Sequence, residues 1–118
     1  MWLITLLTLI LPAKEITIER PFVEMEAIIS HYSSVDSCHT GEDCLMANGR
    51  RAYIGAVACP RSVPLGVLIE INGQNLECAD RTAKWVDGRY DVFTGYGKEA
   101  RERAIELGIR KEKIKIYN

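Results

Sequence analysis

The sequence has no excess of positive charge. Fifteen Lys and Arg residues are balanced by sixteen Asp and Glu residues, which gives a formal net charge of −1 at pH 7. Because a nucleic-acid-binding domain usually carries a basic patch and a high pI, we expect no nucleic-acid partner. Internal repeats and low-complexity tracts are also missing, and the 118 residues are 47% hydrophobic and 26% charged. This composition is typical of one globular domain with a modest core.

No hydrophobic run is long enough to span a bilayer comfortably. An uncharged apolar run at residues 2–12 has the length of the hydrophobic region of a signal peptide. Its flanks are imperfect, because no Lys or Arg precedes it and Leu11-Pro12-Ala13 is a poor cleavage motif. We expect an exported protein of the cell envelope or the extracellular space. The run is then either cleaved or kept for membrane association; the alternative is an added N-terminal strand or a short core helix.

This reasoning divides the chain in two. Residues 1–22 are the signal-like or anchor segment with its arm, and residues 23–118 are the compact domain. Pro21 marks the boundary.

Cysteine is scarce but even in number. Four cysteines in a short chain with a signal-like start are typical of two disulfides, for which three pairings exist. Cys38 and Cys44 share one glycine-containing loop, so we pair them, which leaves Cys59 with Cys78. The second bridge closes a loop of roughly 20 residues and would stabilise the fold by about 3 kcal/mol.

Two alternatives stay open for these cysteines. One is a metal site of Cys38, His39 and Cys44, but adjacent Cys-His is not a usual zinc spacing and no second ligand pair is present. The other is a cytosolic protein with free thiols. We expect no metal, and no sequence feature indicates an organic cofactor.

Short apolar segments with alternating polarity are separated by turn signals such as Asn48-Gly49 and Asn72-Gly73. A long loop at 33–48 is expected to be held by the Cys38–Cys44 bridge. Six short strands and one late helix indicate a mainly β, barrel-like domain. The predicted strands are 23–32, 52–59, 67–71, 76–80, 90–93 and 114–117, and the helix is 98–107.

Residues 79–93 gather acidic and basic side chains among apolar ones. Alternation places Leu76, Cys78 and Asp80 on one face of a strand, and Asp91 lies within the next strand. Two carboxylates at one cleft suit general acid–base chemistry, because burial and neighbouring charge separate their pKa values. The alternative is a hairpin with solvated acidic side chains, and Asp87 in the turn is interpreted as structural.

Five segments, taken in order, resemble the 3D domain family: residues 27–32, 46–49, 57–66, 79–82 and 88–93. This family is named for three aspartates and adopts a six-stranded double-psi β-barrel. It is similar to the catalytic domain of the lytic transglycosylase MltA, to rare lipoprotein A and to expansins. The resemblance covers about residues 24–117 and implies the same barrel here, with one short late helix.

The resemblance implies a lytic transglycosylase that cleaves peptidoglycan between N-acetylmuramic acid and N-acetylglucosamine. Asp91 matches the acid–base aspartate of the family, and Asp80 matches the second aspartate, which stabilises the transition state. Tyr32 matches a tyrosine that lines the sugar groove, although a core tyrosine is an equal alternative. Arg81 is placed with it as substrate-binding. The expected partners are peptidoglycan glycan strands, and nothing indicates oligomerisation, so we expect a monomer.

The sequence also departs from the family. Cys59 stands where the first aspartate is expected, Arg50 where rare lipoprotein A has a glutamate, and Met46 in place of a threonine. The Asp-Thr-Gly-Gly turn is replaced by residues 80–83, Asp-Arg-Thr-Ala. Loss of the first aspartate favours a non-catalytic, expansin-like glycan-binding module. A hydrolase whose two carboxylates activate water is a further alternative, and an unrelated secreted structural or inhibitor domain is the last.

Overall fold

The structure is a computed structural model that describes residues 20–38 and 44–118. The apolar run at 2–12, its proposed cleavage or anchoring, and His39 lie outside the described residues. The division of the chain at residue 22 therefore stays a prediction.

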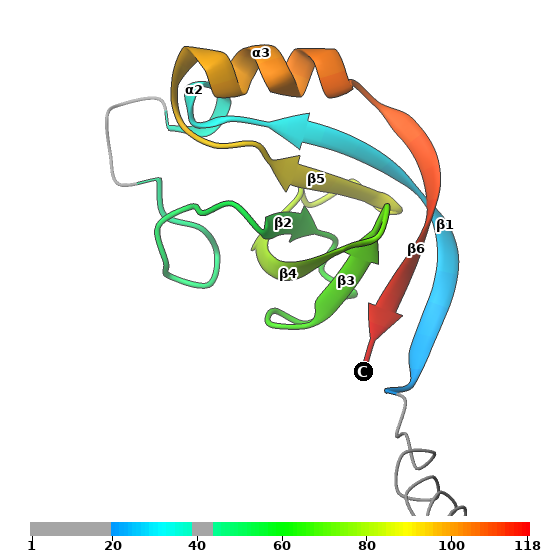
Figure 1. The fold of residues 1–118 in the computed structure, drawn as a ribbon. Coiled ribbons are helices and arrows are strands. Elements are labelled where there is room, and N and C mark those ends of the chain that lie inside the picture. The colour runs from blue at the N-terminus through cyan, green and yellow to red at the C-terminus, as the bar shows by residue number, and fades with distance from the viewer. Residues whose placement is uncertain (1–19, 39–43) are drawn as a thin grey trace, which may run out of the picture.

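Six strands of the described residues close into a barrel, and two helices lie at one end of it (Figure 1). The predicted mainly β class, the six-stranded closed barrel and the late helix are confirmed. The strands are β1 (Phe22–Tyr32), β2 (Ala56–Cys59), β3 (Leu68–Ile71), β4 (Gln74–Arg81), β5 (Arg89–Phe93) and β6 (Arg110–Tyr117); the helices are α2 (Ser34–Ser37) and α3 (Gly97–Leu107).

The order of strands around the barrel is β1-β5-β2-β4-β3-β6. Strands β1 and β5 are parallel, as are β2 and β4, and the other four neighbouring pairs are antiparallel. Exchanging β1, β2 and β3 with β4, β5 and β6 maps the whole pairing scheme onto itself. This internal two-fold pattern fits the double-psi β-barrel, so the chain resembles the 3D domain family in fold.

Most boundaries agree with the sequence prediction to within two residues, and three larger differences have local reasons. Strand β6 begins at Arg110 instead of residue 114, because its charged first half pairs with residues 26–29 of β1. Strand β2 begins at Ala56 instead of residue 52, since a turn closed by Ala56 N–H to Tyr53 O precedes it. Helix α2 occupies part of the predicted loop because Ser33 caps it, accepting the Val35 N–H at 3.2 Å.

Alternation along the strands produces two apolar clusters. The barrel interior holds large buried side chains, and Ile29, Ile69, Tyr90 and Ile114 are each at most 2% exposed. A second group, which we call the outer cluster, lies on the outer face of β1, β5, β2 and β4 under residues 44–53. Its buried members are Tyr32, Met46, Ala52, Ala56, Ala58, Ala79 and Phe93.

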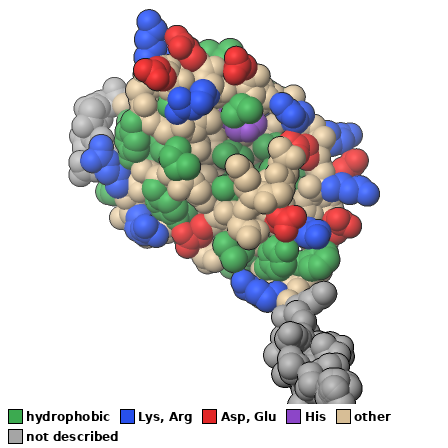
Figure 2. Space-filling model, viewed as in Figure 1, with side chains coloured by type: hydrophobic (Ala, Val, Ile, Leu, Met, Phe, Trp, Pro, Cys, Tyr) green, Lys and Arg blue, Asp and Glu red, His purple; other side chains and the backbone are tan. Residues whose placement is uncertain are grey.

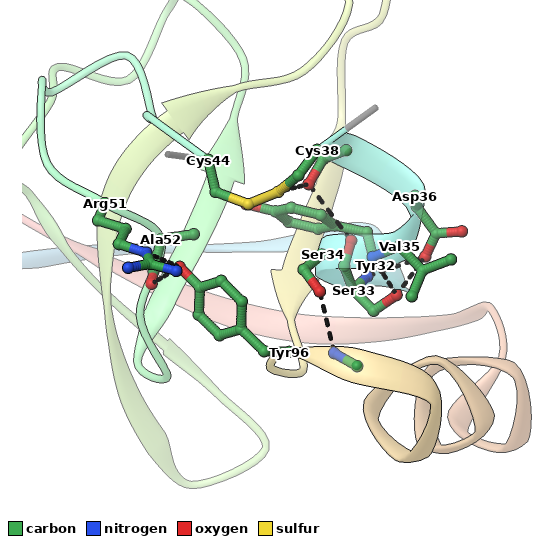
Figure 3. The surroundings of a disulfide bond; sticks show 12 residues. Tyr32, Ser33, Ser34, Val35, Asp36, Cys38, Cys44, Arg51, Ala52 and Tyr96 are labelled. Carbon is green, nitrogen blue, oxygen red and sulfur yellow. Dashed lines mark hydrogen bonds between the residues drawn. A yellow bond between two sulfur atoms is a disulfide. The ribbon is translucent and has the colours of Figure 1, made fainter. Parts of the chain in front are cut away.

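Both predicted disulfides are present. Cys59 and Cys78 join β2 to β4 inside the barrel, where both are fully buried. Cys38 and Cys44 join the end of α2 to the segment that covers the outer cluster (Figure 3). Because these two sulfurs bond to each other, neither is a thiolate ligand for a metal. Two disulfides fit an exported protein.

Charges of both signs are interspersed over the face seen in Figure 2, as expected from a net charge of −1. Within residues 20–38 and 44–118, neither helix combines the length and apolar character needed to cross a membrane.

Candidate functional site

The two predicted catalytic carboxylates lie in one row across the barrel wall. Asp91 of β5 and Asp80 of β4 each pair with Ala58, on opposite sides of the central strand β2. Directly paired residues point to the same face of a sheet, so both carboxylates belong to the outer face. Two interstrand spacings place their Cα atoms about 10 Å apart. Because β2 separates β4 from β5, the alternative of a simple hairpin is wrong.

A bulge in β4 directs Asp80 outward. Val57 pairs with Cys78 and Ala58 pairs with Asp80, so Ala79 is an extra residue in β4. Cys78 points into the barrel, whereas Ala79 and Asp80 both lie on the outer side, as bulged residues do. The alternation that put Leu76, Cys78 and Asp80 on one face is therefore wrong beyond Cys78.

Asp91 is held by a chain of hydrogen bonds from β1 and β5. The Ser30 hydroxyl donates to Asp91 Oδ1 at 2.9 Å, and Arg89 Nε donates to Ser30 Oγ at 3.0 Å. Burial raises the pKa of Asp91, although the Ser30 hydrogen bond and the Arg89 charge act in the opposite direction. The carboxyl therefore keeps its proton to a higher pH than an exposed aspartate, as a general acid requires.

Asp80 is fixed by donors on three sides. The N–H groups of Ala47 and Arg81 donate to Oδ1 at 3.0 and 2.9 Å, and the Tyr32 hydroxyl lies 3.5 Å from Oδ2. Burial first, and then the charges of Asp80 and Asp91, raise the pKa of Tyr32. Tyr32 thus stays protonated, and its hydroxyl donates a hydrogen bond to Asp80 Oδ2.

Tyr32 also packs in the outer cluster. Its ring lies 5.2 Å from that of Phe93, centroid to centroid, and it is 9% exposed. Both interpretations of Tyr32 thus have a structural basis: the ring is part of the core and the hydroxyl faces the row of carboxylates. Contact of Tyr32 with a sugar stays a prediction.

The other two singled-out residues are engaged with backbone. Arg81 Nη1 donates to the carbonyl oxygens of Pro60 and Val63 at 2.8 and 2.5 Å, which secures the turn after β2. Its predicted role in substrate binding stays a prediction. Asp87 is exposed and accepts the Gly88 N–H at 3.0 Å, which fits a structural role in the turn.

Three residues of the site were missed in the sequence: Ser30, Ala58 and Arg89. Ser30 interrupts an apolar strand and is only 2% exposed, so a buried hydroxyl in need of a partner was the available signal. Ala58 is 5% exposed and packs in the outer cluster between the two carboxylate-bearing strands. The sequence carried no signal for Ala58, because its place between the two aspartates depends on β2 lying between β4 and β5.

Fold and site define a closed six-stranded barrel of the double-psi type with two carboxylates on its outer wall. Among solved structures, the fold is similar to MltA from Escherichia coli, described as a lytic transglycosylase, at 21% identity with a TM-score of 0.47. It is similar to E. coli MltA with bound chitohexaose at 18% identity with a TM-score of 0.49.

These matches cover 68% of this chain but 29% of the MltA chain, so the protein spans less than a third of its length. No family model matches the sequence, and no curated protein matches it either.

Proposed function

We propose that the protein is a lytic transglycosylase of the cell envelope that cleaves peptidoglycan between N-acetylmuramic acid and N-acetylglucosamine. The observation that carries this proposal is the row of Asp91, Ala58 and Asp80. It combines a half-buried carboxyl whose pKa is raised with a second carboxylate two strands away. Glycan strands are the partner, and the protein acts as a monomer.

The reaction uses Asp91 twice. Its protonated carboxyl gives the proton to the glycosidic oxygen while the bond from that oxygen to C1 of the muramyl residue breaks. The resulting carboxylate then takes the proton from the C6 hydroxyl of the same residue as O6 bonds to C1. The products are a 1,6-anhydromuramyl end and a free N-acetylglucosamine end, with Asp91 protonated again.

Asp80 stabilises charge in this step, and Ser30 orients the carboxyl group of Asp91. The positive charge that develops at C1 is stabilised by the Asp80 carboxylate, which its backbone donors already hold in place. Ser30 occupies Asp91 Oδ1, so Oδ2 is the oxygen that exchanges the proton with substrate.

Hydrolysis is the second candidate, because two carboxylates on one face are also what an inverting glycosidase uses, one as acid and one as base towards water. In that reaction Asp80 activates water, and the product has a reducing muramyl end. The two candidates therefore differ in product mass by one water.

Binding without cleavage is the third candidate. Cys59, at the position of the missing family aspartate, is bonded to Cys78 inside the barrel, so it supplies no carboxylate. If that aspartate is indispensable, the barrel still holds a glycan on its outer wall but does not cleave it.

The test is a digest of purified peptidoglycan with the disulfide-bonded protein, its products being identified by mass spectrometry. Asp91→Asn runs beside it, since the amide is nearly isosteric but cannot act as an acid. Asp87→Asn is the matched control, because it removes the same charge from an exposed turn and keeps the oxygen that accepts the Gly88 N–H.

Anhydro products from the wild type and Asp87→Asn, with at least a 100-fold lower rate for Asp91→Asn, are expected. Reducing ends would replace the transglycosylase with the hydrolase. No products, with the protein still bound to the sacculi, would overturn the enzyme in favour of the binding module.

A further inference from the structure

A hollow of about 380 Å³ opens on the β1 side of Asp91, whereas Asp80 lies on the β4 side. Ser30 lines this hollow and also donates to Asp91, so the hollow begins one hydrogen bond away from the proposed acid. Its walls come from β1, β5, α2 and α3, which meet at the helical end of the barrel (Figure 1). The volume falls within the range of small-ligand sites.

The charged groups of the hollow favour an anion. Arg89 and Arg101 both line it, and Asp36 is the single carboxylate among its lining residues. Asp36 Oδ2 already accepts the backbone N–H and the hydroxyl of Ser33, each at 2.9 Å, as part of the cap of α2. Arg89 is partly engaged as well, since its Nε donates to Ser30 Oγ, but the two guanidinium groups outnumber the one acid. A planar carboxylate is the anion that the arginine fork binds best.

The rim of the hollow is apolar. Ile105 on α3 and Ile109 after it line the hollow, yet they are 67% and 65% exposed. Two branched side chains left in water beside a pair of arginines gain burial only when a ligand covers them. The ligand defined by these walls carries a carboxylate and small aliphatic groups.

We propose that this hollow binds the peptide stem of peptidoglycan, so that the enzyme selects muramyl residues that still carry their peptide. The stem is attached through the lactyl ether at C3 of N-acetylmuramic acid, next to the C2–C1 side of the ring. Its first residues are a small aliphatic one and a carboxylate-bearing one. The placement rests on the proposed function, since it takes Asp91 to lie at C1 of the muramyl residue.

The experiment measures binding, so it does not depend on cleavage. N-acetylmuramyl-L-alanyl-D-glutamate and N-acetylmuramic acid are titrated into the disulfide-bonded protein, with Kd taken from amide chemical shifts. We expect the peptide to tighten binding at least tenfold, which is about 1.4 kcal/mol, and the shifts to centre on residues 101–109. Arg101→Gln should lose most of that gain.

Lys98→Gln is the matched control, because Lys98 also lies exposed on α3 but does not line this hollow. It should keep the full gain. Equal Kd values for the two ligands, or an equal loss in both variants, would overturn the proposal.

The proposed function can fail separately. A protein that binds the muramyl dipeptide through Arg101 but yields no digest products keeps the peptide site and loses the enzyme. A protein that digests intact and amidase-stripped strands at the same rate, with no Arg101 effect on binding, keeps the enzyme and loses the peptide site.

Discussion

The buried carboxyl group of Asp91 favours the proposed chemistry but lowers the stability of the fold. Burial raises the pKa of this carboxyl, so the folded protein binds its proton more tightly than the unfolded chain does. The free energy of unfolding therefore falls as pH rises from the ordinary carboxyl pKa of 3.8 through the raised pKa of Asp91. The burial that raises the pKa of this carboxyl, and so suits a general acid, therefore lowers stability wherever the unfolded chain would be ionised.

Removing this titration should stabilise the protein. Asp91→Asn keeps the oxygen that accepts the Ser30 hydroxyl but carries no charge at any pH. We expect its Tm at pH 7 to exceed that of the wild type by about 2–5 °C, and the two values to coincide at about pH 3, where the carboxyl is protonated in both states. Thermal unfolding followed by circular dichroism at both pH values is the measurement.

Asp87→Asn serves again as the control, because Asp87 is exposed. It should not change Tm by more than about 1 °C at pH 7. A lower Tm for Asp91→Asn at pH 7 would contradict the assignment of Asp91 as a destabilising buried acid.

At the scale of elements, the junction of β5 and α3 positions the helical end of the barrel. The hydroxyl of Thr94, which follows β5, lies 3.0 Å from the carbonyl oxygen of Tyr32 in β1 and 2.9 Å from that of Ala100 in α3. It therefore ties the end of β1 to α3. Gly95 accepts the Ser34 N–H at 2.9 Å and thereby holds the start of α2. The walls of the hollow beside Asp91 depend on these contacts.

Two glycines in this junction should differ in their tolerance of a side chain. Gly95 has φ +124°, outside the left-handed basin, and an added Cβ would lie 3.4 Å from Ala100 Cβ. Gly97 has φ +87° with nothing near its Cβ position. We expect Gly95→Ala to lower the free energy of unfolding by about 2–3 kcal/mol, and Gly97→Ala by about 1 kcal/mol.

Urea unfolding of both variants measures this difference. Equal losses would mean that the positive φ at each site costs the same and that Gly95 has no special role. Tryptophan or aromatic near-UV signals should remain native-like for both, because neither site lies inside the barrel.

Some strands were predicted from the sequence and others were missed in part. Alternation located the interior-facing part of each strand, since apolar periodicity is set by the core. It missed the first half of β6, residues 110–113, where for example Lys113 pairs with Glu26 of β1, because opposite charges stabilise a strand without an apolar pattern. It also missed the extra residue Ala79, since a bulge depends on the partner strand.

In the whole molecule, the order of strands around the barrel cannot be predicted from the periodicity of the sequence. Asp80 and Asp91 lie on β4 and β5, which follow each other in the sequence. In the barrel, however, β2 lies between these two strands. The resemblance to the 3D domain family provided the barrel and the two aspartates, whereas Ser30 and Arg89 followed only from the register of β1 with β5. Long-range pairing therefore decides which side chains share the site.

The two disulfides should contribute unequally to this closed architecture. The Cys59–Cys78 bridge spans 19 positions and lies in the interior, whereas Cys38–Cys44 spans 6 and is partly exposed. Loop entropy predicts losses of about 3 and about 2 kcal/mol on replacing each pair by alanine. The cavity left by two buried sulfurs adds to the first loss, so the difference should exceed about 1 kcal/mol.

Urea unfolding of the two double variants, Cys59→Ala with Cys78→Ala and Cys38→Ala with Cys44→Ala, measures this ranking. The interior bridge joins the central strand β2 to β4, so its loss should also broaden the signals of Ala58 and Asp80. Loss of the outer bridge should alter mainly α2 and residues 44–53, and it should reach Asp80 only through the Ala47 N–H that donates to its carboxylate. An equal or larger loss for the outer pair would mean that the covering segment, not the barrel interior, limits the stability of the molecule.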